Sequence, residues 1–370
     1  MRLIIAGGGT GGHLFPGIAV AEEFLARDPQ NEVIFVGTAH GIEARAVPAA
    51  GYRLELISAA GIRGKVSISQ FKGACMMLYG YAQSRKILKA FQPDMVLGVG
   101  GYASLPMVLA ARGMQIHSFI HEQNAIPGMS NKLLAKFVDQ VFITLEESAT
   151  FFPKQKTTLT GNPLRRQILH QAAISSGEQP RIDGQGRFRL LIFGGSQGAH
   201  AINMAMIAAL PLLEQISAKL EITHQTGSQD ASQVSETYQR HGFDATVRPF
   251  IDDMATAYKQ ADLVICRAGA TTIAEVTACG RPGIFIPFPH AVDDHQRCNA
   301  EALLKKGAGF MVLERELSGE KLAGMISELM SDPETLQRTA RLAFGLARLD
   351  AAEIIVDEMV KGVTNVRKNR

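Results

Sequence analysis

The stretch Leu3–Gly17 constrains the fold of this chain most, because it joins a strand, a glycine turn and a helix start. The apolar run Leu3–Ala6 predicts a buried strand, and the glycine-rich run 7–12 predicts a tight turn. Pro16 lies where we expect the helix to begin, and Ile18–Arg27 has helical spacing. Such a turn directs backbone N–H groups and the positive end of a helix dipole toward one point. It therefore suits a phosphate, a carboxylate or a charge that develops during a reaction.

His13 is the side chain of this turn that titrates near neutral pH, which makes it a candidate acid or base. Two simpler interpretations stay open. The turn can serve only to pack the helix against the strand, and His13 can serve only as a capping residue.

The same turn excludes two classes of nucleotide site. Gly7, Gly9 and Gly12 fit the G-x-G-x-x-G pattern of dinucleotide-binding proteins. That class also needs a carboxylate at the tip of the second strand. Here the strand Glu32–Val36 ends in Gly37-Thr38, so we expect no carboxylate at its tip. A P-loop is excluded because no Gly-Lys-Ser/Thr follows the glycines.

Length and composition indicate an ordinary globular protein of two domains. The chain has 370 residues, 46% of them hydrophobic and 20% charged, and its net charge of +3 predicts no nucleic-acid partner. The four cysteines form no C-x-x-C pair, which argues against a zinc site or a disulfide framework and favours reduced thiols in a cytoplasmic protein. We see no signal peptide, and we expect no apolar run of the roughly 18–20 residues that cross a membrane.

Short apolar runs alternate with helical patterns along the chain, which predicts a doubly wound α/β fold with parallel sheets. The predicted strands are Leu3–Ala6, Val33–Val36, Leu54–Ile57, Met95–Leu97, Ile116–Ile120, Val141–Ile143, Arg189–Phe193, Leu220–Thr223, Ala245–Arg248, Leu263–Cys266 and Gly283–Ile286.

The strand–glycine–helix pattern returns at Arg189–Phe193, followed by the glycine-rich run 194–199 and a helix from about His200. Two α/β halves facing across a cleft follow from this repeat, with ligands beyond the carboxyl ends of the strands. We expect domains of 1–165 and 166–345, a surface loop over Gln171–Arg187, and a helical stretch Glu334–Lys361. A C-terminal helix of about 346–370 is predicted to pack back on the first domain.

Polar segments follow several predicted strands. His121-Glu122-Gln123-Asn124 lies where a substrate would bind, unless it is only a hydrogen-bonded loop. Gly100-Gly101 is a third anion-friendly turn. Glu275, in the first turns of a predicted helix, can accept two hydroxyls of a ribose or can simply complement the helix dipole. The polar loop Pro287–Asn299 contains His290, Asp293, Asp294 and His295, but their spacing matches no known metal site.

The segment Ile57–Pro93 combines apolar side chains with six basic residues and no acidic one. The basic residues are Arg63, Lys65, Lys72, Arg85, Lys86 and Lys89. This mixture suits an anionic membrane surface, although an ordinary core helix with a solvated basic face has the same composition.

Eight blocks, in this order, resemble the MurG family of N-acetylglucosaminyltransferases. They are GGGTGGHLFPG, GGYAS, HEQN, TGNPLR, GGSQGA, FIDDM, CRAGATTIAE and DDHQRCNA, and the match runs from the first strand to about Ala300. The resemblance implies the GT-B fold, two Rossmann-like domains facing across a cleft. It implies inverting transfer of GlcNAc from UDP-GlcNAc to the MurNAc C4 hydroxyl of lipid I, which makes lipid II for peptidoglycan.

Residue roles follow from the resemblance only. It implies that His13 is the catalytic base and that Thr10, Gly11, Gly12 and Asn124 contact the donor sugar. Arg165 and Ser196 would lie along the diphosphate, and Ile251 would contact the uracil through its backbone. Phosphate and ribose would be held by Ala270, Thr271, Thr272, Ile273, Ala274 and Glu275, with Glu275 on the ribose hydroxyls. Gln296 would reach the sugar hydroxyls.

The resemblance also implies partners and a location. No metal and no cofactor take part, since glycine-turn amides, a helix dipole and Arg165 can stabilise the leaving diphosphate. The family implies a peripheral protein on the cytoplasmic side of the inner membrane, with the first domain facing lipid I and the membrane and the second binding UDP-GlcNAc. Other cell-wall enzymes are possible partners. The family's membrane face would correspond to Ile57–Pro93, although this chain has no Trp to anchor it.

Three alternatives remain at this point. Another GT-B transferase, such as one that modifies a natural product, is disfavoured by TGGHLFPG, HEQN and GGSQGA together. A nicotinamide dehydrogenase is disfavoured by the missing acid after Val36. A non-catalytic membrane scaffold is disfavoured by the intact nucleotide-side residues.

Overall fold

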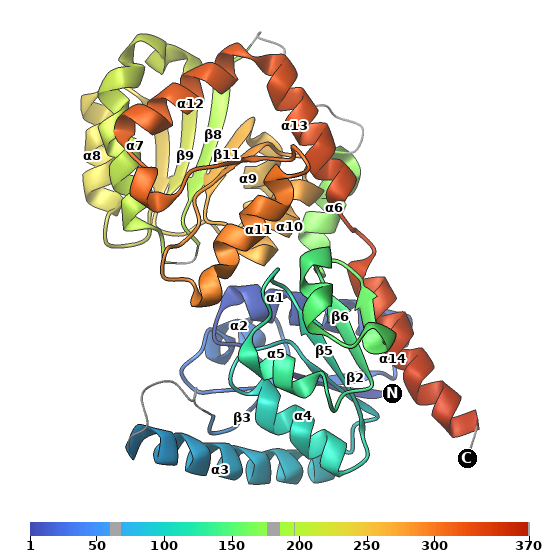
Figure 1. Ribbon diagram of the computed structural model, residues 1–370. Helices are drawn as coiled ribbons and strands as arrows, with labels where there is room; N and C mark the ends of the chain where they lie inside the picture. Colours follow the sequence, from blue (N-terminus) through green and yellow to red (C-terminus); the bar gives the residue numbers. More distant parts are fainter. Residues whose placement is uncertain (60–67, 176–185, 196, 369–370) are drawn as a thin grey trace. The chain divides into compact units, whose positions relative to one another are not determined.

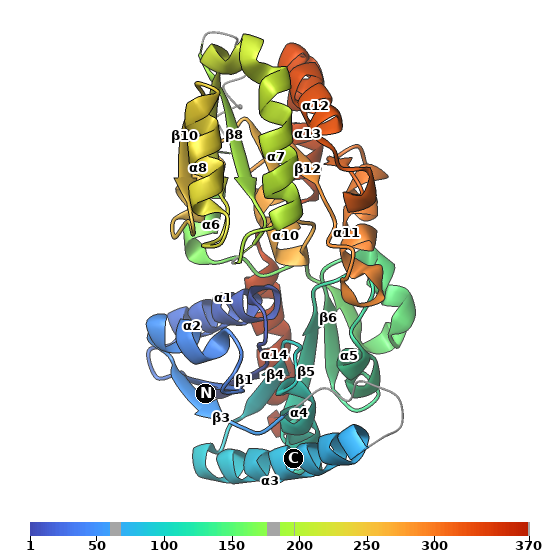
Figure 2. The same cartoon turned by 90° about the vertical axis from the view of Figure 1, so that its left-hand side faces the viewer.

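The computed structural model describes residues 1–59, 68–175, 186–195 and 197–368. The chain divides into two compact units, unit 1 (Met1–Arg165 with Arg348–Arg370) and unit 2 (Arg166–Ala347). Each unit is a parallel sheet with helices on both faces (Figures 1 and 2). The predicted α/β fold with two parallel-sheet units is confirmed.

Within the described residues, the sheet of unit 1 has seven parallel strands in the order β3-β2-β1-β4-β5-β6-β7. They are β1 (Arg2–Ala6), β2 (Glu32–Gly37), β3 (Arg53–Leu56), β4 (Met95–Gly98), β5 (His117–Glu122), β6 (Gln140–Ile143) and β7 (Thr157–Leu159). The α-helices of unit 1 are α1 (Gly11–Arg27), α2 (Glu43–Ala49), α3 (Ile68–Phe91), α4 (Ser104–Gly113), α5 (Met129–Leu134) and α14 (Ala351–Lys368). Two short 3₁₀ segments, Glu146–Phe151 and Lys154–Lys156, precede β7.

The central strand β1 shows how this sheet is held between two helix layers. Its side chains alternate between the faces, because successive residues of a strand point in opposite directions. Leu3 and Ile5 pack in the cluster that contains α1 and α14. Ile4 and Ala6 pack in the cluster that contains α4 and α5. Both faces are thus buried, which explains why the strands of the sequence read as continuous apolar runs.

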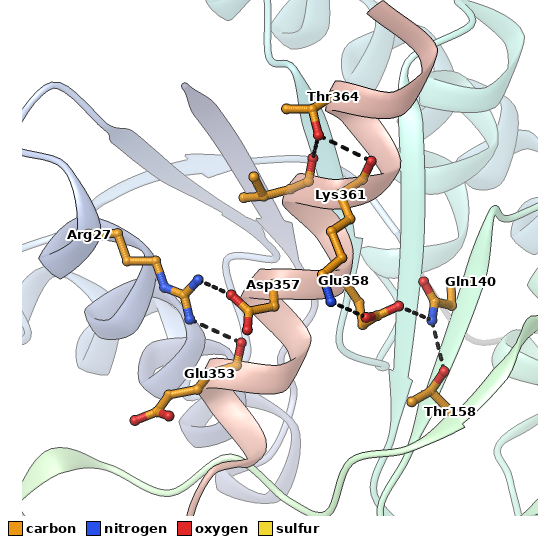
Figure 3. Close-up of polar contacts among 9 residues, drawn as sticks. Arg27, Gln140, Thr158, Glu353, Asp357, Glu358, Lys361 and Thr364 are labelled. Carbon is orange, nitrogen blue, oxygen red and sulfur yellow. Dashed lines mark hydrogen bonds and ion pairs between the residues drawn. The ribbon is translucent and has the colours of Figure 1, made fainter. Parts of the chain in front are cut away.

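Helix α14 returns to unit 1 and packs on α1 (Figure 3). Arg27 pairs with Asp357 and also donates to the Glu353 carbonyl, and Gln140 donates to both Thr158 and Glu358. Surface ion pairs contribute only about 0–1 kcal/mol. The main stabilisation comes from the buried side chains of Ile355, Val356 and Met359, each worth about 1.5–3 kcal/mol.

Unit 2 repeats this architecture with a sheet that, in its described part, has six parallel strands in the order β10-β9-β8-β11-β12-β13. They are β8 (Phe188–Phe193), β9 (Leu220–Gln225), β10 (Asp244–Arg248), β11 (Leu263–Cys266), β12 (Gly283–Phe285) and β13 (Phe310–Met311). Its α-helices are α6 (Arg166–Ser175), α7 (His200–Leu213), α8 (Ala231–Arg240), α9 (Met254–Gln260), α10 (Ala270–Ala278), α11 (His295–Leu304), α12 (Gly319–Ser331) and α13 (Pro333–Leu346). The 3₁₀ segments are Glu214–Lys219, Val292–Asp294 and Glu314–Glu316.

The prediction that α1 begins at Pro16 is wrong, because the helix starts at Gly11 and contains Pro16. The Thr10 carbonyl accepts from the N–H groups of His13 (3.3 Å) and Leu14 (3.2 Å), so the first turn closes before the proline is reached. Glycines disfavour helix by about 1 kcal/mol each, which is why the pattern indicated a loop there.

Other predicted boundaries are also wrong. The start of the predicted loop Gln171–Arg187 belongs to α6, and the end of the predicted loop Pro287–Asn299 belongs to α11. Residues 176–185 lie outside the described part. The predicted helical stretch Glu334–Lys361 is two helices, α13 and α14. Strands β7 and β13 were not predicted, since they have only three and two residues and lack a buried apolar run.

Among the described residues, one helical segment, His200–Lys219, is long and apolar enough to cross a membrane by length and composition alone. This segment is α7 with the 3₁₀ turn after it. Its apolar side chains Ile202, Met206 and Leu210 are fully buried in the core of unit 2, where α7 packs against α12. The segment therefore reads as a core helix of that unit.

Candidate functional site

The first glycine turn connects β1 to α1 and depends on backbone conformations that favour glycine. Gly7, Gly8 and Gly9 have φ values of 154°, 143° and 86°. A Cβ on Gly7 would stand 2.4 Å from the Gly100 carbonyl oxygen, and one on Gly101 would stand 2.4 Å from the Gly8 carbonyl oxygen. The glycines of the first and third turns therefore let the two backbones touch, rather than leaving a space for an anion there.

A buried carboxylate occupies the first turn. Glu43, at the start of α2, is 1% exposed. Its Oε2 accepts from the Gly9 N–H (2.7 Å), and its Oε1 accepts from the Thr38 N–H and hydroxyl (2.9 Å each). A Cβ on Gly8, Gly37 or Gly41 would collide with this carboxylate. The turn that the sequence indicated as an anion site thus already holds an anionic group of its own.

This carboxylate also corrects the expectation that no acid stands at the tip of β2. Glu43 reaches that tip through Thr38, although it lies six residues beyond Gly37 in the sequence. It is enclosed by protein, however, and binds the turn rather than facing outward for a ribose.

His13 lies in the first turn of α1 and is half-buried. Its Nδ1 is 2.9 Å from Oε1 of Gln123. A Cβ on Gly100 would come within 2.8 Å of the same Nδ1, so the glycine at 100 makes room for the imidazole. Gln123 follows β5 and His13 follows β1, and β4 lies between these two strands in the sheet, so their carboxyl ends at the same edge position this pair.

The polar segment 121–124 is mostly internal. His121, Glu122 and Gln123 are each about 1% exposed, and Asn124 is half-buried. The Glu122 carboxylate accepts from the Asn124 N–H (3.0 Å), the Gly128 N–H (3.1 Å) and Asn131 Nδ2 (2.8 Å). Asn124 Nδ2 also donates to the Glu122 carboxylate at 3.2 Å, so all four side chains take part in building the segment.

The other residues of unit 1 that we singled out lie around the start of α1. Thr10 is the N-cap, and Gly11 and Gly12 are the first two helical residues. Phe15, one turn on, lies 4.5 Å below the Arg165 guanidinium and is the side chain that a Cβ on Gly11 would strike. The structure therefore brings Arg165 next to the helix start that carries His13.

The glycine turn of unit 2 connects β8 to α7 and is closed by an amide rather than a carboxylate. Gln225 Nε2 donates to the Gly195 carbonyl (2.6 Å), and Gln225 Oε1 accepts from the Ile251 N–H (3.0 Å). Gly198 has φ +77°, and a Cβ there would overlap the Thr226 carbonyl. Ser196, which we also predicted to act here, lies outside the described residues.

Ile251 is buried, and its N–H is already bonded to Gln225. A uracil that is recognised through this backbone would therefore use the Ile251 carbonyl first.

Helix α10 begins directly after β11, with Gly269 as its N-cap. The residues Ala270, Thr271, Thr272, Ile273, Ala274 and Glu275 form its first turns, as predicted. A helix start presents N–H groups without intrahelical acceptors, together with the positive dipole end. This is an arrangement that can hold a phosphate.

Glu275 is buried in α10 and accepts a hydrogen bond from the Tyr258 hydroxyl at 3.0 Å. Burial raises the pKa of Tyr258 far above its ordinary value, and the Glu275 charge raises it further. Burial likewise raises the pKa of Cys279 to about 12. Tyr258 and Cys279 beside the Glu275 carboxylate thus stay neutral, and the phenol donates to one of its oxygens.

Gln296 lies in α11, and its Oε1 accepts from the Phe288 N–H at 3.0 Å. The neighbouring Asp293 and Asp294 both have a φ of 52°, a conformation that non-glycine residues rarely adopt. Across the described ranges, no cluster of three or more His, Cys, Asp or Glu is arranged to hold a metal ion, and this includes His290 and His295.

Sequence reasoning missed Glu43, Gln225 and Tyr258. Each forms its hydrogen bonds with residues that are distant in sequence, which are Gly9, Ile251 and Glu275 respectively. The sequence offered only a weak signal for Glu43, namely the two glycines, Gly37 and Gly41, that leave room for its side chain.

Comparison with known proteins agrees with this architecture. Residues 3–143 match the glycosyltransferase family 28 N-terminal domain, and residues 189–355 match the family 28 C-terminal domain. A Geobacter sulfurreducens protein is 66% identical over 97% of this chain and 98% of its own length. A Geobacter metallireducens protein is 64% identical over 100% of both chains. Both carry the name UDP-N-acetylglucosamine–N-acetylmuramyl-(pentapeptide) pyrophosphoryl-undecaprenol N-acetylglucosamine transferase.

Solved structures give the same result. The crystal structure of Acinetobacter baumannii MurG is 32% identical, has a TM-score of 0.77, and the match covers 97% of this chain and 99% of that one. A UDP-GlcNAc 2-epimerase from Neisseria meningitidis has a TM-score of 0.68 at 12% identity over 98% of this chain and 100% of that one, a likeness of fold alone.

Two parallel-sheet α/β units that carry both family 28 domains define a glycosyltransferase of the GT-B type. Within that class, the chain belongs to the MurG family of N-acetylglucosamine transferases.

Proposed function

We propose that this chain transfers GlcNAc from UDP-GlcNAc to the C4 hydroxyl of the MurNAc of lipid I, giving lipid II and UDP in peptidoglycan synthesis. The observation that carries this proposal is the 66% identity, over 97% of the chain, to a transferase named for that donor and acceptor. A fold alone would not suffice, because related folds host many activities.

The proposed reaction is one in-line displacement with inversion at the sugar C1. His13 takes the acceptor hydroxyl proton while the new C1–O bond forms. The bond from C1 to the diphosphate breaks, and its electron pair leaves on UDP. The half-buried position of His13 at the start of α1 supports its role as the base.

The leaving diphosphate needs stabilisation of the charge it gains. Since Glu43 occupies the glycine turn of unit 1, we assign this task to the first turn of α10 in unit 2 together with Ser196 and Arg165. Ile251 and Glu275 would hold the uracil and the ribose. Thr10, Gly11, Gly12, Asn124 and Gln296 would hold the sugar.

We further propose that α3 rests on an anionic membrane surface, which would place the enzyme on the cytoplasmic side of the inner membrane. Leu78 and Tyr79 are 72% and 60% exposed, and Arg85, Lys86 and Lys89 on the same helix are exposed as well. Arg63, Lys65 and the rest of 60–67 lie outside the described residues. Leu78→Glu should weaken sedimentation with phosphatidylglycerol vesicles, whereas Leu212→Glu, an exposed leucine of unit 2, should not.

The test of the main proposal is incubation with radiolabelled UDP-GlcNAc and a short-chain lipid I analogue. We expect a labelled disaccharide–lipid product and UDP in equal amounts. UDP release without a disaccharide, or transfer to an acceptor that lacks MurNAc, would contradict the proposal.

A further inference from the structure

A continuous line of hydrogen bonds runs inside unit 1 from a backbone carbonyl to His13. His121 Nε2 lies 3.2 Å from the Gly161 carbonyl oxygen, and His121 Nδ1 lies 3.0 Å from Gln123 Nε2. Gln123 Nε2 also lies 3.1 Å from the Val99 carbonyl oxygen, and Gln123 Oε1 lies 2.9 Å from His13 Nδ1. The line joins the ends of β1, β4 and β5 with the segment after β7.

The backbone carbonyls of Gly161 and Val99 determine which nitrogen donates at each step of this line, because a carbonyl oxygen can only accept a hydrogen bond. The Gly161 carbonyl requires the proton of His121 to stand on Nε2, which leaves the His121 Nδ1 lone pair for Gln123. The Thr144 hydroxyl oxygen, 3.3 Å from the same Nε2, then faces an N–H group and accepts as well. The Val99 carbonyl requires the amide nitrogen of Gln123 on its side. Both ends therefore place the Gln123 oxygen toward His13.

This assignment needs a neutral His121, and its surroundings keep it so. The side chain is 1% exposed. Burial lowers the pKa of His121, the hydrogen bond to the Gly161 carbonyl raises it and His13 lowers it, and the net pKa is about 4. A protonated His121 would direct an Nδ1–H at the Gln123 amide hydrogens, which would repel it.

The Gln123 oxygen that faces His13 Nδ1 determines which nitrogen of the His13 ring carries the proton. The Nδ1 must carry a proton in order to donate to Gln123 Oε1, so in the neutral ring the lone pair stands on Nε2. The glycine at 100 lies beside the same ring nitrogen, since a Cβ there would stand 2.8 Å from Nδ1.

We propose that Gln123 and His121 are positioning residues that hold neutral His13 in its Nδ1–H form and so present Nε2 as the proton acceptor for the transfer reaction. This inference rests on the proposed function, in which His13 is the base. The acceptor hydroxyl proton moves to Nε2, and the resulting imidazolium keeps its Nδ1–H bond to Gln123. The charge is therefore formed without any rearrangement of the network.

The first test is a ¹⁵N NMR spectrum of protein labelled at histidine, with the His13 signals identified from their loss in His13→Gln. We expect the wild-type enzyme at neutral pH to show the Nδ1–H form at His13. An Nε2–H form would overturn the proposal, and this readout is independent of activity. If instead the wild-type enzyme makes no disaccharide product, the proposed function fails while the tautomer is still determined.

The second test removes the amide. In Gln123→Met, of similar size, we expect loss of the Nδ1–H preference and a kcat lower by ~10–100-fold, a part of what acid–base catalysis contributes. The KM for UDP-GlcNAc should stay within about twofold, because binding groups are untouched. The control is Gln140→Met, which removes a hydrogen-bonded glutamine at the amino end of β6 and should change neither readout. An unchanged kcat and tautomer in Gln123→Met would overturn the proposal.

A pair of His121 variants keeps the test valid if Gln123→Met does not fold. His121→Asn places an amide oxygen near the position of Nδ1 and can still accept from Gln123, whereas His121→Leu cannot. We expect His121→Asn to retain the His13 tautomer and more of the kcat than His121→Leu. Equal behaviour of the two variants would show that His121 only fills space, which would contradict its assigned role.

Discussion

The two glycine turns of this protein look alike in sequence but differ in charge. In unit 1 the Gly9 N–H is bound by the buried Glu43 carboxylate. In unit 2 the Gly195 carbonyl is bound by the neutral amide of Gln225. A strand–glycine–helix pattern therefore predicts a tight connection, but the side chain that closes the turn decides whether an anion can enter it. The proposed mechanism accordingly assigns the base to unit 1 and the diphosphate site to unit 2.

The largest effect should come from His13 of unit 1, the proposed base. His13→Ala should lower kcat by ~10²–10⁴-fold, the usual contribution of acid–base catalysis, and should leave the affinity for UDP-GlcNAc nearly unchanged. Steady-state kinetics combined with calorimetric titration of UDP would measure both quantities. An equal loss of donor affinity would remove His13 as the base and would make it a donor-binding residue.

The second-largest effect is expected for Glu43, which we expect to stabilise the first glycine turn rather than to bind a ligand. Glu43→Gln would leave the donors of Gly9 and Thr38 facing an amide with one oxygen, at a cost of about 2–4 kcal/mol in the free energy of unfolding. Urea denaturation measures it. Glu23→Gln, which removes a surface ion pair with Arg27, should cost less than about 1 kcal/mol. If Glu43→Gln folds normally but loses UDP, the contrast between the turns is wrong.

Each unit also buries a histidine, and these should make the protein labile to acid. Burial lowers the pKa of His121 to about 4 and that of His224 to about 3, against 6.5 in the unfolded chain. Between these values the unfolded chain binds more protons, so stability falls as the pH drops below 6.5. From pH 7 to pH 5 we expect a loss of about 2 kcal/mol per histidine.

The measurement is the urea midpoint at the two pH values. His121→Asn and His224→Gln should each remove one part of the loss. His200, which is exposed, provides the control variant His200→Gln. A pH dependence that is unchanged in both buried-site variants would contradict this account.

A smaller effect is expected at Glu275 of unit 2, the carboxylate that we propose to hold the ribose. Glu275→Ala should raise the KM for UDP-GlcNAc by ~10–30-fold, since a hydrogen bond to a charged group contributes about 1.5–3 kcal/mol. Initial rates over a range of donor concentrations measure this change. Donor kinetics like those of the wild type would discard the ribose role.

The smallest effect belongs to the residue that fixes this carboxylate. Tyr258→Phe removes only the hydroxyl that donates to Glu275 and should raise the same KM by ~2–5-fold, the size of a neutral hydrogen bond. A KM raised as far as in Glu275→Ala would show that Tyr258 shapes the whole site and not one oxygen.

The sequence predicts the strands of this fold well, because both faces of each sheet are covered by helices. Buried residues such as Ile4, Val96 and Ile192 therefore stand in continuous apolar runs. It predicts helix starts poorly at Gly11, where packing overrides the low helix propensity of glycine. Short edge strands such as Thr157–Leu159 carry no such signal.

The site shows the same limit. His13 and Gln123 could be singled out because each follows a strand, but their hydrogen bond depends on the neighbouring positions of β1, β4 and β5 in the sheet. Glu43 could not be found from local pattern, since its partners come together only in the folded unit. The ligand contacts assigned to Thr10, Arg165, Ile251 and Gln296 stay predictions.

A crystal structure with UDP bound tests the central claim most directly. The account predicts the diphosphate on the first-turn amides of α10, with the ribose hydroxyls at Glu275 and the uracil at the Ile251 backbone. A diphosphate seated on the amides of Gly7–Gly9, with Glu43 displaced, would contradict it.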